Sequence, residues 1–227
     1  GPWRKRSGSA RTVNVLVTAG PTREAIDPVR FVSNRSSGKM GYALAAAARA
    51  RGHAVCLVSG PVALEPPRGV EVVRVTTAAD MLAAVRKRVR ACDLLVMAAA
   101  VADWRPKNPA RRKLKKSAGP PRIAWEPTPD VLQTLAPLKK KSQTFCGFAA
   151  ETHALAREAR RKLRAKNLDA IAANDVSKKD RGFEAERNAL TIFFADGRVV
   201  RVALATKTKC ATTLLRALEE ISTAKKK

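Results

Sequence analysis

The residue types that could do chemistry are concentrated in one polar loop near the start of the chain. Residues 15–41 read VLVTAGPTREAIDPVRFVSNRSSGKMG, so an apolar run around Thr18 is followed by a long loop that ends in S-S-G-K. A buried strand that leads through small residues into a helix presents backbone N–H groups to an anion. The loop also carries Arg30, Asn34 and Lys39. We therefore expect it to bind an anion; the alternative is a structural loop in which Asn34 makes turn hydrogen bonds.

Two later segments combine small residues with one polar or aromatic side chain. Residues 98–104 read AAAVADW, and residues 147–152 read GFAAET. Small residues at the end of a strand let a flat ring lie close to the backbone. Asp103 could then accept a hydrogen bond from a ribose hydroxyl, a base or a metal-bound water, and Phe148 could stack on a base or ribose. The alternatives are a helix cap for Asp103 and a core position for Phe148.

Lysines are available to neutralise phosphate at two places. Lys113 lies in residues 104–121, a segment rich in proline and cations that we interpret as a mobile flap or partly disordered loop. A cation on such a flap could close over a triphosphate. Lys162 and Lys166 are four residues apart and share one face of an expected helix. That face either meets the site or is a solvated charged surface.

Two common nucleotide-binding motifs are missing from the first loop. A dinucleotide fingerprint needs G-x-G-x-x-G, whereas the loop reads G-P-T-R-E and S-S-G-K-M-G. The phosphate loop of many NTPases needs Ser or Thr after the lysine, but Met40 follows Lys39. The sequence therefore argues against a nicotinamide-dependent oxidoreductase and against an ordinary phosphate-loop NTPase.

The elements that would position these residues alternate between strand and helix. Strands are predicted at residues 13–19, 54–59, 70–75, 93–100, 123–125, 144–149 and 168–172, and helices at residues 39–51, 78–90, 129–138, 154–166 and 206–221. A hairpin is predicted for residues 188–195 and 198–203 around Asp196-Gly197. This alternation predicts a doubly wound, mostly parallel sheet that binds ligands beyond the carboxyl ends of its strands.

Length and composition predict one domain at residues 12–222. Residues 1–11 are interpreted as a tag remnant or disordered tail, and residues 223–227 as a basic tail. The sequence contains no apolar run of about 18 residues and no apolar signal-peptide core, so we expect a cytoplasmic protein. The four scattered cysteines and two histidines form no zinc motif and predict buried, reduced thiols.

The net charge of +26 raises the question of nucleic-acid binding. A basic surface predicts salt-dependent binding of polyanions without sequence preference. Only one Tyr and three Trp are present to stack on bases, and no helix-turn-helix or zinc-finger signature appears. Specific nucleic-acid binding is therefore not expected, although a basic nucleotide- or nucleic-acid-binding module without ligase activity remains the alternative function. Part of the charge could instead attract small anionic substrates.

The order of the motifs resembles that of one enzyme family. The matching segments are GPTREAIDPVRFVSNRSSGKMG (20–41), LVSGPV (57–62), AAAVADW (98–104), KLKK (113–116), PTPDVL (127–132), GFAAET (147–152), KLRAKNLD (162–169) and ANDV (173–176). In this order they resemble phosphopantothenoylcysteine synthetase, and the similarity runs from residue 13 to residue 221. The form SNRSSGKMG resembles the bacterial branch, which implies CTP rather than ATP as the activating nucleotide.

The resemblance implies a Rossmann-like α/β fold and a ligase of coenzyme A biosynthesis. The carboxylate of 4'-phosphopantothenate would attack the α-phosphate of CTP in the presence of Mg²⁺, and the amine of L-cysteine would then displace CMP. The resemblance also implies a homodimer, to which the hairpin at Asp196-Gly197 could contribute, and association with a phosphopantothenoylcysteine decarboxylase.

Residue roles carry over from the same motifs. The implied catalytic residues are Asn34 for the second step and Lys113 for the first, with Lys115 or Lys116 as substitutes for Lys113. The implied substrate-binding residues are Arg30, Ser36, Ser37, Gly38, Lys39 and Ala100. The implied nucleotide-binding residues are Ala98, Ala99, Asp103, Lys113, Pro129, Asp130, Val131, Leu132, Phe148, Lys162 and Lys166. The metal ligands are not implied by any motif.

Overall fold

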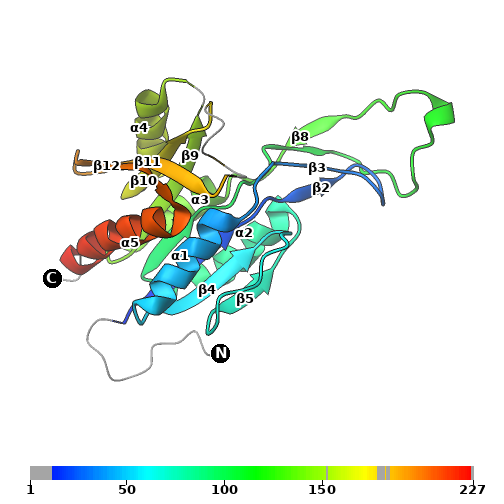
Figure 1. Ribbon diagram of the computed structural model, residues 1–227. Helices are drawn as coiled ribbons and strands as arrows, with labels where there is room; N and C mark the ends of the chain where they lie inside the picture. Colours follow the sequence, from blue (N-terminus) through cyan, green and yellow to red (C-terminus); the bar gives the residue numbers. More distant parts are fainter. Residues whose placement is uncertain (1–11, 152, 178–181, 183–184, 226–227) are drawn as a thin grey trace.

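A single eight-stranded sheet forms the centre of the molecule (Figure 1). The structure, a computed structural model, describes residues 12–151, 153–177, 182 and 185–225. The tail predicted at residues 1–11 and the last two residues of the basic tail lie outside the described residues. The strand order is β12-β11-β10-β9-β6-β1-β4-β5. Its strands are β1 (Asn14–Ala19), β4 (Ala54–Ser59), β5 (Glu71–Arg74), β6 (Leu94–Met97), β9 (Thr144–Glu151), β10 (Ala170–Asp175), β11 (Arg187–Phe194) and β12 (Val199–Thr206).

The sheet is parallel from β5 to β10 and antiparallel at β11 and β12. β1 lies at the centre, where Val15 is paired with Val55 of β4 on one side and Leu94 of β6 on the other. All six residues of β1 are buried, as expected for a parallel strand covered on both faces. The predicted α/β fold with a C-terminal antiparallel hairpin is confirmed.

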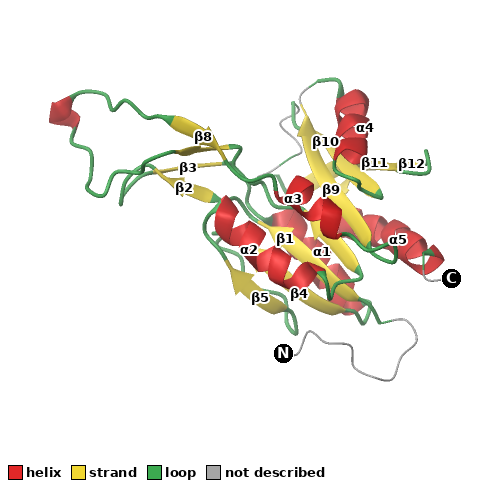
Figure 2. Cartoon of the chain, turned by 180° about the vertical axis from the view of Figure 1, so that it is seen from behind, coloured by secondary structure: helices red, strands yellow, loops and turns green. Residues whose placement is uncertain are grey.

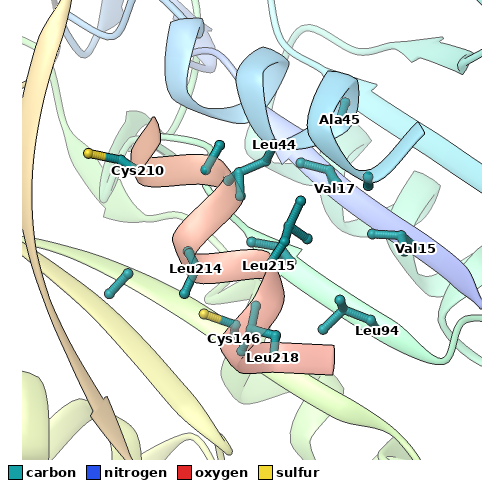
Figure 3. Packing of buried hydrophobic residues seen from close by; sticks show 14 of the residues in the cluster. Val15, Val17, Leu44, Ala45, Leu94, Cys146, Cys210, Leu214, Leu215 and Leu218 are labelled. Carbon is teal, nitrogen blue, oxygen red and sulfur yellow. The ribbon is translucent and has the colours of Figure 1, made fainter. Parts of the chain in front are cut away.

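Helices cover both faces of the sheet. They are α1 (Lys39–Ala50), α2 (Ala78–Val89), α3 (Val131–Leu135), α4 (Leu155–Ala165) and α5 (Lys207–Ala224). α1 and α5 pack side by side on one face, where Leu44, Leu214 and Leu215 are fully buried (Figure 3). α2, α3 and α4 contribute to the core on the other face (Figure 2). Burying one such leucine stabilises the fold by about 1.5–3 kcal/mol, so the two cores make the sheet a rigid platform for its loops.

Several element ends differ from the prediction, and the helix predicted at residues 129–138 differs for a local reason. The strand predicted at residues 93–100 ends at Met97, after which three alanines leave the sheet. The helix predicted at residues 129–138 begins at Val131 because Asp130 caps it, and it tightens into a 3₁₀ turn at Ala136–Leu138, where Pro137 lacks an N–H donor. α5 continues to Ala224, so part of the predicted basic tail is helical.

An arm extends from the body of the molecule (Figures 1 and 2). It consists of the antiparallel pair β2 (Arg23–Ala25) and β3 (Phe31–Ser33) and the antiparallel pair β7 (Trp104–Pro106) and β8 (Trp125–Pro127), with a 3₁₀ turn at Lys116–Ala118. The segment interpreted as a flap, residues 104–121, therefore begins as a paired strand rather than as an irregular loop. Strands of three residues carry too little alternation to be predicted.

Two further predictions from the composition concern the burial of the cysteine thiols and the presence of membrane-spanning helices. Cys56, Cys92, Cys146 and Cys210 are all buried and unpaired, as predicted. Burial raises the pKa of the Cys56 thiol to about 11 and those of Cys92 and Cys146 to about 12, so these thiols are poor nucleophiles. Every helix within the described part of the chain is too short or too polar to cross a bilayer.

Candidate functional site

A cavity of about 550 Å³ lies where the central parallel strands end. Met97 of β6, Phe148 and Ala150 of β9 and Asn174 of β10 all line it. This is the edge of a doubly wound sheet at which ligands bind, and the volume is within the usual range of small-molecule sites.

Most of the residues predicted from the sequence lie together around this cavity. The predicted residues that line it are Asn34, Ser36, Gly38, Lys39, Ala98, Ala99, Ala100, Asp103, Pro129, Asp130, Val131, Leu132, Phe148, Lys162 and Lys166. Three predicted residues, Arg30, Ser37 and Lys113, are not among the lining residues. Arg30 and Lys113 belong to the arm instead.

The amide of Asn34 has a defined orientation. Its Nδ2 group donates to the backbone oxygen of Ala100 at 3.1 Å and to that of Val101 at 3.0 Å. Two carbonyl acceptors require the NH₂ side of the amide at that position. Oδ1 is consequently the atom through which Asn34 can accept a hydrogen bond from a molecule in the cavity.

The alanine segment at residues 98–103 is held in place by threonines from neighbouring segments. The Ala99 N–H donates to Thr18 Oγ1 at 3.1 Å, and the Ala102 N–H donates to Thr22 Oγ1 at 3.0 Å. Thr128 Oγ1 donates to the Ala102 carbonyl. The backbone that forms one wall of the cavity is therefore fixed by hydrogen bonds to three threonine hydroxyls.

The start of α1 forms the opposite part of the site. Gly38 precedes the helix with φ 78°, and a Cβ added there would lie 2.8 Å from Val62 Cγ1. Gly38 caps the helix without any side-chain hydrogen bond, and the first turn contains no acidic residue. The N-terminus of α1 can therefore receive an anionic group of a ligand.

Three of the lysines that line the cavity form ion pairs with carboxylates. Lys162 Nζ lies 2.7 Å from Glu151 Oε1, and Lys166 Nζ lies 2.8 Å from Asp130 Oδ2. Lys39 pairs with Glu186. Burial opposes the charged form of Asp130, but the hydrogen bond from Lys166 and those from backbone N–H groups outweigh it and hold the pKa of this carboxyl below its usual range.

Sequence reasoning missed four polar residues of the cavity: Thr128, Asn174, Asn188 and Lys207. Asn174 belongs to the ANDV motif, so its position at the end of a strand was a usable signal. Lys207 is the first residue of α5 and is only 6% exposed. A lysine at the start of an amphipathic helix is normally predicted to be exposed to solvent, and nothing in the sequence indicates that Lys207 is buried.

Asp27 joins the two hairpins of the arm, because it lies in the turn between β2 and β3 and binds Leu114 of the segment between β7 and β8. Its buried carboxylate accepts hydrogen bonds from the N–H groups of Val29, Arg30 and Leu114 and from the Arg30 guanidinium, whose Nη2 lies 2.6 Å from Asp27 Oδ2. Arg30 also donates to the Leu114 carbonyl at 2.8 Å. The Arg30 guanidinium holds the pKa of Asp27 well below its usual range. We call this set of contacts the Asp27 clasp.

We expect Asp27→Asn to loosen the clasp. The substitution removes the charge and places NH₂ donors against the donors of Arg30 and Leu114, so the Leu114 and Arg30 amides should exchange with solvent about tenfold faster or more. The measurement is hydrogen–deuterium exchange of the folded protein. Because the folded-state pKa of Asp27 is lowered, the wild-type clasp should persist at pH values at which an ordinary carboxyl of pKa 3.8 protonates, and should be lost only at lower pH.

Asp196→Asn is the matched control for this experiment. Asp196 also accepts from a backbone N–H and from the guanidinium of the same residue, Arg198, but it lies in the turn between β11 and β12. That variant should change exchange only around its own turn. Unchanged exchange of Leu114 in Asp27→Asn would show that the clasp does not hold the arm.

The carboxylates of the site do not form a metal cage. Among the residues that the structure describes, no three His, Cys, Asp or Glu side chains come close enough together to hold an ion. A divalent cation such as Mg²⁺ keeps several waters and is commonly held by one or two carboxylates and substrate phosphates.

Comparisons with known proteins identify the family of this chain. The family model of the DNA/pantothenate metabolism flavoprotein C-terminal domain matches residues 10–221. The chain is 47% identical over 210 residues to coenzyme A biosynthesis bifunctional protein CoaBC of Bacillus subtilis, covering 92% of this chain and 52% of that protein. It is 48% identical over 188 residues to the protein of the same name from Escherichia coli, covering 82% and 46%. The chain thus spans about half the length of these relatives.

Solved structures show the same architecture. The crystal structure of the C-terminal domain of CoaBC superposes with a TM-score of 0.79 at 43% identity, covering 94% of this chain and 98% of that one. A Cab2 variant in complex with phosphopantothenate-cysteine has a TM-score of 0.75 at 17% identity, covering 92% and 87%, which establishes likeness of fold alone. From the span of the family model and the identity to its curated relatives, the chain belongs to the DNA/pantothenate metabolism flavoprotein C-terminal domain family.

Proposed function

We propose that this chain joins 4'-phosphopantothenate to L-cysteine, with CTP as the activating nucleotide. The observation that carries the proposal is the cavity itself, which brings the Asn34 amide, a wall of small residues and several lysines into one space. The 47–48% identity to proteins named for coenzyme A biosynthesis supports the same substrates. The reaction has two steps, and the residues divide between them.

The first step activates a carboxylate, which is a poor acylating agent. A carboxylate oxygen of 4'-phosphopantothenate attacks the α-phosphorus of CTP, and the bond to the pyrophosphate oxygen breaks. The products are an acyl-cytidylate and pyrophosphate. Negative charge accumulates on the phosphate oxygens, and preorganised cations stabilise it. Lys162 and Lys166 line the cavity and suit the bound triphosphate, while Lys113 is the arm cation assigned to the transfer itself.

The second step forms the amide. The amine of cysteine attacks the acyl carbon, the bond to the cytidylate oxygen breaks, and CMP leaves as the nitrogen gives up a proton. Asn34 Oδ1 can accept a hydrogen bond from this amine because Nδ2 is already committed to two backbone carbonyls. Holding the amine in this orientation next to the acyl carbon lowers the activation barrier of amide formation.

The nucleotide is assigned to the side of the cavity formed by the alanine segment and Phe148. Ala98 and Ala99 leave room for a ring against the backbone, and Phe148 also lines this space. Asp103, whose side chain lines the same cavity, is placed to accept from a ribose or base donor. Mg²⁺ would arrive with the CTP phosphates, in keeping with the absence of a carboxylate cage among the described residues.

The test is a nucleotide-selectivity assay on the purified chain of 227 residues. Purified protein is mixed with 4'-phosphopantothenate, L-cysteine and Mg²⁺, together with CTP or ATP, and pyrophosphate and CMP or AMP are measured. We expect CMP and pyrophosphate only when CTP and 4'-phosphopantothenate are both present. Pyrophosphate release that persists without 4'-phosphopantothenate would overturn the proposed function, and equal turnover with ATP would overturn the choice of nucleotide.

A nucleic-acid-binding role is the second candidate, and the charge of +26 is the observation in its favour. A salt series that compares CTP with a short DNA duplex separates the two. A saturable CTP site supports the ligase, whereas a steep salt dependence for duplex without a CTP site supports the alternative.

We further propose that two copies of the chain associate through the arm. Four large apolar side chains are exposed there: Val29, Phe31, Trp104 and Trp125, with exposed fractions of 46–59%. A group of exposed apolar residues on one projection is typical of an interaction surface, and it makes the arm a better candidate than the Asp196-Gly197 hairpin. Sedimentation should give a particle of twice 24.5 kDa.

The relatives are bifunctional proteins about twice as long as this chain. We therefore also propose that the chain associates with a decarboxylase.

A further inference from the structure

The first hairpin of the arm is attached to the body of the molecule at the start of α2. In β2 the side chains of Arg23 and Ala25 are exposed, whereas Glu24 between them is only 3% exposed. The Glu24 carboxylate faces inward, and its Oε1 accepts a hydrogen bond at 2.8 Å from the N–H of Ala78, the first residue of α2. In both views β2 lies where the arm leaves the body, close to α2 (Figures 1 and 2).

The backbone of the same strand is also bound to the body. The Arg23 N–H donates to the carbonyl of Thr76, just before α2, at 2.8 Å. The Thr22 N–H donates to the Ala100 carbonyl at 3.3 Å. Ser33, the last residue of β3, donates through Oγ to the Thr22 carbonyl at 2.7 Å and is paired with Arg23 in the hairpin. Both strands of this hairpin are therefore held where they meet the body.

Glu24 binds α2 independently of the local cap of that helix. The first N–H groups of a helix have no partner within the helix. Thr77 and Asp80 form a capping box, in which the Asp80 N–H donates to Thr77 Oγ1 and the Thr77 N–H donates to Asp80 Oδ2. The Ala78 N–H lies outside this box and is bound by Glu24, which is 54 residues earlier in the chain. Both carboxylates are favoured by the partial positive charge of the helix end, but only Glu24 links the helix to the arm.

We propose that Glu24 is a positioning residue for amide formation and that it acts through Asn34. The inference rests on the proposed function, because it concerns the role assigned there to Asn34. Asn34 directly follows Ser33, so the hairpin that Glu24 anchors ends at the residue that carries the reacting amide. Glu24 itself does not line the cavity. A small displacement of a group that orients a nucleophile lowers the rate by a large factor.

The test is Glu24→Met, which keeps an unbranched side chain of similar length and removes the acceptor. With 4'-phosphopantothenate, CTP and L-cysteine, we expect acyl-cytidylate formation to stay within about threefold of the wild-type rate. Amide formation should slow about tenfold or more, so that acyl-cytidylate accumulates. The KM for CTP should stay the same. Glu24→Gln keeps an oxygen that can accept from the Ala78 N–H, so it should recover most of the lost rate.

Asp80→Ala is the matched control, because it removes the other carboxylate that caps α2. It should lower the temperature of thermal unfolding, since the capping box is lost, but leave amide formation unchanged. Equal loss of amide formation in Asp80→Ala and Glu24→Met would show that Glu24 only stabilises α2. Normal amide formation by Glu24→Met would also overturn the positioning role.

If Glu24→Met does not fold, the same hydrogen bond can be removed from the side of its donor. Ala78→Pro eliminates the N–H, and proline is favoured at the first position of a helix. Thr77 already has the extended backbone (φ −100°, ψ 166°) that a residue before proline prefers. This variant should also slow amide formation about tenfold and leave the first step within about threefold of the wild-type rate.

Hydrogen–deuterium exchange tests the anchor without any reaction. The Arg23 amide, which donates to Thr76, should exchange about tenfold faster in Glu24→Met and at the wild-type rate in Asp80→Ala. Unchanged exchange of Arg23 in Glu24→Met would overturn the anchor. Wild-type protein that forms no pyrophosphate from CTP and 4'-phosphopantothenate would overturn the proposed function and, with it, the role in amide formation, while the exchange result for the anchor would stand.

Discussion

Replacing Asn34 by alanine should leave the first half of the reaction intact and block the second. Acyl-cytidylate should accumulate in an amount equal to the enzyme, with one equivalent of pyrophosphate, while amide formation slows roughly 100- to 1,000-fold. The reason is the orientation of the amide: Nδ2 is held by the carbonyls of Ala100 and Val101, so Oδ1 is the acceptor for the cysteine amine. Acid quenching of a reaction with radiolabelled CTP measures the intermediate directly.

The same two hydrogen bonds mean that Asn34→Ala also frees part of the cavity wall, and a control must separate the two effects. Thr22→Val loses the hydrogen bond that the Ala102 N–H donates to Thr22 Oγ1 but removes no group that lines the cavity. That variant should raise the KM for CTP without accumulation of acyl-cytidylate. Asn34→Asp should be at least as impaired as Asn34→Ala, because a carboxylate would face two carbonyl oxygens. Normal amide formation by Asn34→Ala would contradict the assigned role.

Lys113→Ala should fail one step earlier than Asn34→Ala. Without the arm cation, pyrophosphate release should fall about 1,000-fold and no acyl-cytidylate should be trapped, since one cation at a transferring phosphoryl group contributes on this scale. Lys113 is exposed and precedes Leu114, whose N–H and carbonyl are both bound by the Asp27 clasp. Lys113 and Lys115 are thus the two lysines beside the anchored Leu114, whereas Lys116 is one residue further away.

Lys115→Ala and Lys116→Ala are the controls for this assignment. Both lysines are exposed neighbours on the same segment, so each variant removes an equal charge. They should retain the first step. If either reproduces the loss, the catalytic role moves to that lysine, and if Lys113→Ala and Asn34→Ala behave identically, the division of the reaction between the two residues is wrong.

The sequence predicted the body of the site well because of where its residues fall. Ala98 follows β6, Asp130 caps α3, and Phe148 lies in the second half of β9. Buried parallel strands are apolar runs that are easily recognised in a sequence. The fold then brings the ends of such strands to one edge. Fifteen of the predicted residues line the cavity for this reason.

What the sequence could not predict depends on contacts between distant segments. The arm is built from strands of three residues, and the contact between its two hairpins depends on the buried Asp27, which the sequence alone would place in a solvated loop. Lys207 was missed because only the packing of α5 against α1 buries it. Arg30 was expected to contact substrate, and the structure shows it paired with Asp27 outside the lining of the cavity, so its role in binding stays a prediction.

The pairs Lys39–Glu186, Lys162–Glu151 and Lys166–Asp130 have a consequence for turnover. Lysines without carboxylate partners would bind pyrophosphate and CMP as tightly as they bind the substrates, and product release would then limit the rate. In the proposed reaction, each departing phosphate would leave a lysine whose own carboxylate is within reach. These three lysines would then recover their ion pairs by side-chain rotation alone, ready for the next cycle.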